Sequence, residues 1–131
     1  MKILLIGGGL IGCERLDALK SISINYSVDF DITVVDQNKE TLRLLKEKYN
    51  CHVYTKINDL DTNTYEWVFV CTPHSEAPEI IIESFSFSKN ILVEKPVCIK
   101  YSEAKELYNT ALEKKCFIMG GHLLLFHPAF I

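Results

Sequence analysis

Six short apolar runs alternate along the chain with longer segments of helical periodicity. The runs are rich in β-branched and aromatic residues, which favours strands over buried helices. They cover residues 2–6, 32–35, 51–54, 67–71, 91–93 and 117–119. Strands that are apolar throughout are typical of a parallel sheet buried on both faces. The alternation therefore predicts an α/β fold with a doubly wound, mainly parallel six-stranded sheet and helices on both faces.

Four segments between these runs carry the helical spacing, over residues 10–21, 40–49, 77–87 and 102–115. In the second, Leu42 and Leu45 lie opposite Lys and Glu residues, and Asn38 is the expected N-cap. Ser102 is the expected N-cap of the fourth, and residues 23–31 are expected to form a loop. The expected apolar stripes of the first and fourth helices are Ile11, Leu16 and Leu19, and Ala104, Leu107, Tyr108, Ala111 and Leu112.

Length and composition limit the chain to one folded domain, expected to span residues 1–131. Of the 131 residues, 48% are apolar and 24% are charged, which is ordinary globular usage. The net charge of -3 provides no general attraction for polyanions, so nucleic acid is not an expected partner. No apolar run approaches the roughly 20 residues that cross a bilayer, so no membrane partner is expected either.

The five cysteines are odd in number and form no C-x-x-C pair. They are expected to be free thiols in a reducing cytosol, which predicts a cytoplasmic protein, and none is nominated as a nucleophile. No metal site is expected, because His122 and His127 lie five positions apart and no carboxylate completes a zinc set. The first 13 residues resemble a lipoprotein signal ending at Cys13, but their glycines fit a strand, turn and helix better.

The most specific local motif is G-x-G-x-x-G, formed by Gly7, Gly9 and Gly12 between the first strand and the first helix. The first glycine permits a tight turn, Gly9 lets the backbone approach a pyrophosphate, and Gly12 lets helix and strand pack closely. The helix N-terminus at Leu10 and Ile11 would offer N–H groups to the phosphates. The motif predicts a Rossmann-type dinucleotide site, with a glycine-rich turn that holds no ligand as the alternative.

Asp36 ends the second strand, 24 positions after Gly12, where a carboxylate commonly accepts hydrogen bonds from the adenosine ribose. Gln37 follows it in the same candidate site. The carboxylate would repel a 2′-phosphate, so NAD is the expected cofactor, and Lys39 keeps NADP as a less favoured alternative. Asp36 could instead cap the following turn, and the two roles can coexist.

Two further strand ends carry candidate cofactor contacts. The fourth strand ends in Cys71, Thr72, Pro73 and His74, and the fifth ends in Glu94 and Lys95 before Pro96. Ligands of open α/β sheets bind beyond the carboxyl ends of the strands, so these residues should meet the nicotinamide half of the cofactor.

Together these motifs resemble the N-terminal half of the glucose-fructose oxidoreductase, inositol dehydrogenase and MocA family over essentially the whole chain. The matching segments are Gly7 to Gly12, Asp36, Thr72-Pro73, Ile91 to Pro96 and Gly121 to Pro128. The resemblance implies that Lys95 lies beside nicotinamide and substrate, as the one catalytic residue named here. It also implies hydride transfer between NAD and a hydroxyl carbon of a sugar or sugar-nucleotide, the substrate class suggested by the tail.

The chain departs from the family pattern at several positions. Ala77 stands where members commonly carry a His, Ser88 replaces a Gly, and Leu125 replaces an Arg. The family continues past Ile131 into a second α/β domain that carries the acid/base residue, so weak NAD binding without turnover is expected of this chain. The alternatives are a stand-alone NAD-sensing regulatory domain and an inactive truncated remnant. The apolar segment 123–126 predicts self-association, giving a homo-oligomer.

Overall fold

Six strands and four α-helices alternate in the computed structural model, which describes residues 1–62 and 64–130. The strands are β1 (Lys2–Ile6), β2 (Asp31–Val35), β3 (His52–Tyr54), β4 (Trp67–Val70), β5 (Asn90–Val93) and β6 (Phe117–Gly120). The helices are α1 (Leu10–Tyr26), α2 (Lys39–Tyr49), α3 (Ala77–Ser84) and α4 (Tyr101–Lys114). Short 3-10 turns cover η1 (Ile57–Asp59), η2 (Leu123–Phe126) and η3 (Pro128–Phe130). Ile131, the end of the expected domain, lies outside the described residues.

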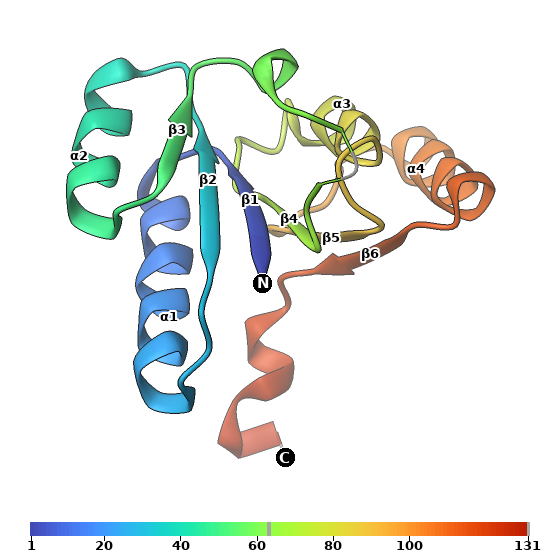
Figure 1. Cartoon of the computed structure of the whole chain (residues 1–131). Helices are drawn as coiled ribbons and strands as arrows, with labels where there is room; N and C mark the ends of the chain where they lie inside the picture. The colour runs from blue at the N-terminus through green and yellow to red at the C-terminus, as the bar shows by residue number, and fades with distance from the viewer. Residues whose placement is uncertain (63, 131) are drawn as a thin grey trace.

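All described strand pairs are parallel, and the strand order is β3-β2-β1-β4-β5-β6 (Figure 1). The order reverses between β1 and β4, where the chain crosses from one half of the sheet to the other. The register pairs Ile6 with both Val35 and Val70, and Val70 with Val93, so these strands end at the same level. This confirms the predicted doubly wound α/β fold, with a sheet that is wholly parallel.

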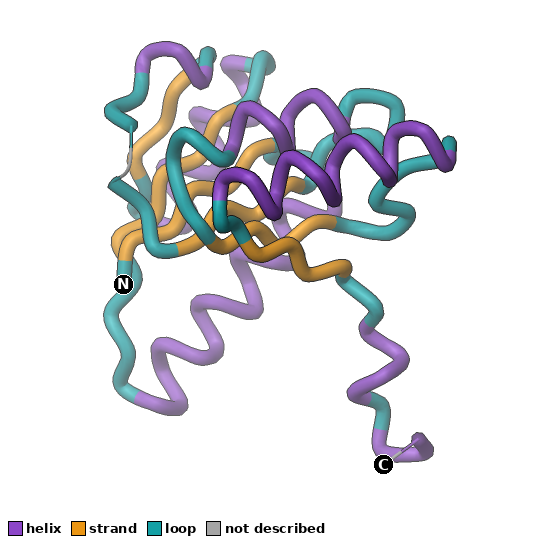
Figure 2. Tube along the Cα trace, turned by 90° about the vertical axis from the view of Figure 1, so that its right-hand side faces the viewer, coloured by secondary structure: helices purple, strands orange, loops and turns teal. Residues whose placement is uncertain are grey.

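Helices cover both faces of the sheet, as predicted (Figures 1 and 2). One buried cluster joins the β4 and β5 side chains to α3 and α4, with Ile81 and Leu107 at its centre. A second cluster joins Leu5 and Val34 of the sheet to Leu16 of α1 and to α2. No helix among the described residues is long and apolar enough to cross a membrane.

The first helix is longer than predicted, because α1 runs to Tyr26 through part of the expected loop. No glycine or proline interrupts the sequence between Gly12 and Tyr26, so the backbone hydrogen bonding continues through this segment. The added turns carry exposed side chains at Ile24 and Tyr26, which explains the missing apolar period. The helix ends at Ser27, in the left-handed conformation with φ of 53°.

The expected N-cap and part of the apolar stripe of α4 are wrong. The helix begins at Tyr101 rather than after Ser102, and the Glu103 carboxylate accepts a hydrogen bond from the Lys100 N–H at 3.3 Å. Leu107 and Ala111 are buried as expected. Tyr108 and Leu112, by contrast, are 64% and 60% exposed. Within this stripe, Leu107 and Ala111 join the buried cluster that α4 shares with α3.

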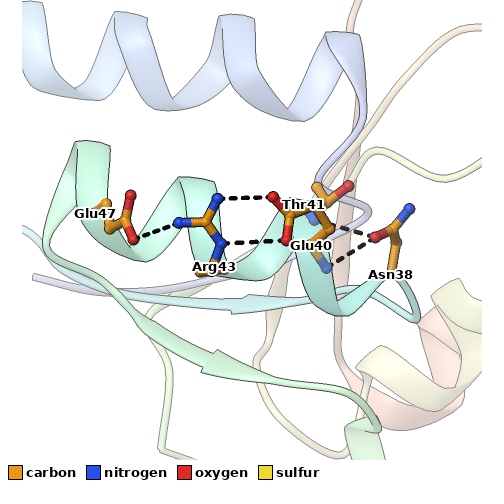
Figure 3. Close-up of polar contacts among 5 residues, drawn as sticks. All are labelled: Asn38, Glu40, Thr41, Arg43 and Glu47. Carbon is orange, nitrogen blue, oxygen red and sulfur yellow. Dashed lines mark hydrogen bonds and ion pairs between the residues drawn. The ribbon is translucent and has the colours of Figure 1, made fainter.

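Asn38 caps α2 as predicted (Figure 3). Its Oδ1 accepts hydrogen bonds from the backbone N–H groups of Glu40 at 2.9 Å and Thr41 at 3.1 Å. On the outer face, the Arg43 guanidinium bridges the carboxylates of Glu40 and Glu47, each at 2.7 Å. The cap fixes where α2 begins, three residues after Asp36.

The face of the sheet that carries α1 is only half covered. Figures 1 and 2 show α1 and the C-terminal segment projecting from the same side of the sheet. A cavity of about 280 Å³ lies there, lined chiefly by apolar side chains. They include Leu19, Phe30, Trp67, Phe69, Leu92 and Met119. Leu123 and Phe126 line its outer side and are themselves exposed, which continues the apolar surface outward.

We expect this apolar face to make the chain self-associate as its concentration rises, because large exposed apolar patches favour contact. Sedimentation velocity over a concentration series measures it. The double substitution Leu123→Ser and Phe126→Ser should weaken the association about a hundredfold or more, since each of the two side chains contributes roughly 1.5–3 kcal/mol when the association buries it. Tyr101→Ser, at an 82% exposed residue of α4, is the matched control and should change nothing. A monomer at every concentration would contradict the expectation.

Candidate functional site

Every predicted site residue lies at the carboxyl edge of the sheet. Because β1, β2, β4 and β5 are parallel and in register, the segments that follow them leave the sheet on the same side. Gly7 and Gly9 lie between β1 and α1, whereas Leu10, Ile11 and Gly12 form the start of α1, and β2 is followed by Asp36 and Gln37. Cys71, Thr72, Pro73 and His74 follow β4, and Glu94 and Lys95 follow β5.

At two positions of the glycine motif, the close approach of neighbouring backbone atoms leaves no room for a side chain. Gly7 has a φ of +97°, and a Cβ there would lie 2.8 Å from the carbonyl carbon and oxygen of Cys71. A Cβ on Gly12 would lie 2.1 Å from the Gly7 carbonyl oxygen. These contacts hold the N-terminus of α1 directly against the end of β1 and beside the end of β4. The motif therefore has a structural function whether or not a ligand is present.

Gly9 differs from both, because a Cβ there would meet nothing within 4 Å. Gly9 is the N-cap of α1, and among the described residues no side chain caps this helix end or places an acid in its first turn. The side chains of Leu10 and Ile11 are exposed, so Ile11 does not join the inner stripe predicted for it. A helix N-terminus of this kind presents backbone N–H groups and a positive dipole end to an anion. Close packing gives no reason for glycine at this position, whereas approach by an anion does.

The Asp36 carboxylate ties the glycine turn to the end of β2. Its Oδ2 accepts a hydrogen bond from the Gly8 N–H at 2.7 Å, and its Oδ1 accepts one from the Asn38 N–H at 2.7 Å. The predicted turn-capping role is therefore real. A carboxylate has about four lone-pair positions, so each oxygen can still accept a ribose hydroxyl. Gln37, the next residue, is exposed.

The residues that follow β4 lie directly beside the glycine turn. The Thr72 hydroxyl oxygen is buried and has no hydrogen-bond partner within the described part of the chain. An unsatisfied buried hydroxyl is costly, and a ligand that enters the turn could supply the missing partner. Burial, together with the nearby Glu94 charge, raises the pKa of the Cys71 thiol to about 12. The thiol therefore stays neutral at physiological pH, while Pro73 and His74 are exposed at the rim.

The end of β5 separates its two charged residues. Glu94 points back to α1, where the Arg15 Nε donates a hydrogen bond to its Oε1 at 2.7 Å and the Arg15 Nη2 bonds the same oxygen. Lys95, the next residue, is exposed at the edge of the sheet. The structure thus brings Glu94 into contact with the first helix and leaves Lys95 accessible.

Arg15 was missed by the sequence reasoning, although the sequence contains a signal for it. It lies three residues after Gly12 and four before Leu19, both of which are buried on the inner face of α1. A charge in the middle of a buried stripe requires a partner of opposite sign. Residues 1–62 and 64–130 contain no group of three or more His, Cys, Asp or Glu residues that could hold a metal ion.

A parallel sheet with this strand order, a glycine turn against its first helix and an acid at the end of β2 define a Rossmann-type α/β domain. The sequence model of the protein family GFO_IDH_MocA, described as "Oxidoreductase family, NAD-binding Rossmann fold", matches residues 1–122 of this chain. The chain belongs to this family, which confirms the resemblance inferred from its motifs.

Three known proteins illustrate what the chain is similar to. The 2,7-anhydro-N-acetylneuraminate hydratase of Mediterraneibacter gnavus is 31% identical over 100 residues, covering 72% of this chain. The WlbA dehydrogenase from Bordetella pertussis, in complex with NADH and UDP-GlcNAcA, has a TM-score of 0.86 at 16% identity over 98% of this chain. KijD10, a 3-ketoreductase from Actinomadura kijaniata in complex with NADP, has a TM-score of 0.83 at 20% identity over 98% of this chain.

The chain spans only part of the length of these proteins. It covers 25% of the hydratase and 39% of each of the two solved structures. The family membership therefore concerns the NAD-binding part of such proteins. Their cofactors include NADH in one and NADP in another.

Proposed function

We propose that this chain is the NAD-binding domain of an oxidoreductase that transfers hydride between nicotinamide and a hydroxyl carbon of a sugar or sugar-nucleotide. The observation that carries the proposal is the open space at Gly9 in front of the N-terminus of α1. Asp36 lies beside it, held against the backbone of the same turn. One helix end for the pyrophosphate and one carboxylate for the ribose are what a dinucleotide requires at this edge.

The rest of the edge suits the other half of the cofactor. The buried hydroxyl of Thr72 lacks a hydrogen-bond partner among the described residues. A polar group of a bound cofactor would supply that partner. When bound, NAD supplies the hydride acceptor at its nicotinamide ring. Lys95 is accessible at the neighbouring strand end, and its positive charge would stabilise an alkoxide that develops on the substrate. The general base belongs to the part of such enzymes that this chain does not span.

We propose NAD rather than NADP, because the Asp36 carboxylate would repel a 2′-phosphate. The sugar or sugar-nucleotide substrate is supported by the UDP-GlcNAcA found in the WlbA structure. All five cysteines are free, which suits a reducing compartment, and we propose the cytoplasm.

The Asp36→Ala substitution should weaken NAD binding by about 1–3 kcal/mol, the scale of hydrogen bonds to a charged group. It should weaken NADP binding less, because it removes both the ribose acceptor and the charge that repels a 2′-phosphate. Calorimetric titration of the whole chain with each cofactor measures both effects. Asp36→Asn, which keeps one oxygen acceptor, should fall between the wild type and Asp36→Ala.

Asp31→Ala provides the control, since it removes a carboxylate from the opposite end of the same strand. It should leave both affinities unchanged. Asp36 also accepts hydrogen bonds from the Gly8 and Asn38 N–H groups, so its loss should lower stability as well as affinity. The thermal unfolding temperature of each variant distinguishes a loss of stability from the loss of a cofactor contact. If Asp36→Ala bound NAD as tightly as the wild type, Asp36 would not belong to the cofactor site.

A further inference from the structure

The ion pair between Arg15 and Glu94 joins two parts of the candidate site that are 79 positions apart in the sequence. Only 16% of the Arg15 side chain and 18% of the Glu94 side chain are exposed. Covered charges that lose their partner carry a large desolvation cost, so such a pair stays formed. Two nitrogen atoms of the guanidinium, Nε and Nη2, bond the same carboxylate oxygen, Oε1.

Glu94 is restrained from the other side as well. Its backbone N–H donates to the Val70 carbonyl oxygen at 3.2 Å, which joins the ends of β4 and β5. A Cβ on Gly121 would lie 3.1 Å from Glu94 Oε2, and the Gly121 N–H donates to the Val93 carbonyl oxygen at 2.8 Å. The Glu94 carboxylate is therefore enclosed between α1 and the turn that follows β6.

The restraint bears directly on Lys95, the next residue. Its own side chain is exposed, so its position depends on the direction in which the backbone leaves Glu94. Arg15 projects from α1, the helix whose N-terminus is the proposed pyrophosphate site, one turn after Gly12. The ion pair thus connects the helix at the phosphate end of the proposed site to Glu94, the residue directly before Lys95.

We infer that Arg15 is a positioning residue, which acts through Glu94 to hold Lys95 in register with the nicotinamide end of a bound dinucleotide. The inference rests on the proposed function. In this proposal Arg15 acts through Glu94 and not through a contact with the cofactor. Its loss should therefore affect recognition of the nicotinamide end and leave recognition of the adenosine and pyrophosphate unchanged.

The test compares two ligands on the whole chain, NADH and ADP-ribose, which lacks only the nicotinamide ring. The measured quantity is the ratio of the ADP-ribose to the NADH dissociation constant. We expect Arg15→Met to lower this ratio about tenfold, the lower end of the scale of one charge-assisted hydrogen bond, with ADP-ribose affinity changed less than about twofold. Arg15→Lys, which keeps the charge but has one nitrogen, should lower it less and carries the test if Arg15→Met does not fold.

Arg43→Met is the matched control, because it removes another ion-paired arginine, from the outer face of α2. It should leave the ratio unchanged. An equal loss of affinity for both ligands in Arg15→Met would show that Arg15 only stabilises the domain and would overturn the inference. An unchanged ratio in a folded Arg15→Met variant would also overturn it. If the wild type bound neither ligand, the proposed function itself would fail, which is a distinguishable result.

Discussion

Replacing Gly12 by alanine is expected to lower the free energy of unfolding by about 3 kcal/mol or more, the upper range for overpacked positions. The added Cβ would lie 2.1 Å from the Gly7 carbonyl oxygen and 3.2 Å from its carbonyl carbon. Both are backbone atoms, so no side-chain rotation relieves the clash. The helix must move away from β1, which opens the cluster in which Leu16 packs on Leu5.

Chemical denaturation followed by circular dichroism measures this effect. Gly120→Ala adds the same methyl group at the end of β6, where the nearest atoms belong to the His122 ring at 3.1 Å. A side chain can rotate away, so this control should lose far less stability. A Gly12→Ala variant with an unchanged denaturation midpoint would mean that α1 and β1 are not packed as closely as described.

The sheet could be predicted from the sequence because its central strands carry apolar side chains on both faces. A run such as Trp67–Val70 is apolar throughout, and this pattern depends on burial rather than on which helix lies above it. For the same reason, the sequence does not indicate that half of one sheet face is left uncovered by helices. Phe69 and Leu92 face the open cavity, yet they are as apolar as Val68 and Ile91, which face the covered side. The residues of a strand show that its face is apolar, but they do not show which element covers that face.

The candidate site could be predicted only where its geometry is local in the sequence. The glycine turn and its helix are adjacent, and Asp36 lies at a characteristic spacing, so both could be placed. The Arg15 and Glu94 pair could not, because no pattern specifies which charges meet across 79 positions. The end of α1 was missed for a related reason. Residues 22–26 form helix through backbone hydrogen bonds alone, without the buried stripe that periodicity detects.

Gly9→Ala is expected to have the opposite consequence to Gly12→Ala, with stability retained and dinucleotide affinity lost. A Cβ on Gly9 has no neighbour within 4 Å, so the fold accommodates it. The methyl group would occupy the space in front of the α1 N-terminus and hold the pyrophosphate away from the N–H groups there. Losing one charge-assisted hydrogen bond costs about 1.5–3 kcal/mol, which is roughly a tenfold to hundredfold weaker affinity.

Titration with NADH and ADP-ribose measures this loss, which should be equal for the two ligands because both carry the pyrophosphate. That equality separates the phosphate end of the site from the nicotinamide end, where Arg15→Met should affect NADH alone. Gly120→Ala should bind both ligands as the wild type does. A Gly9→Ala variant that folds and binds NADH with unchanged affinity would remove the glycine turn from the cofactor site. The domain would then retain the packing role of Gly7 and Gly12 without the dinucleotide that we propose for it.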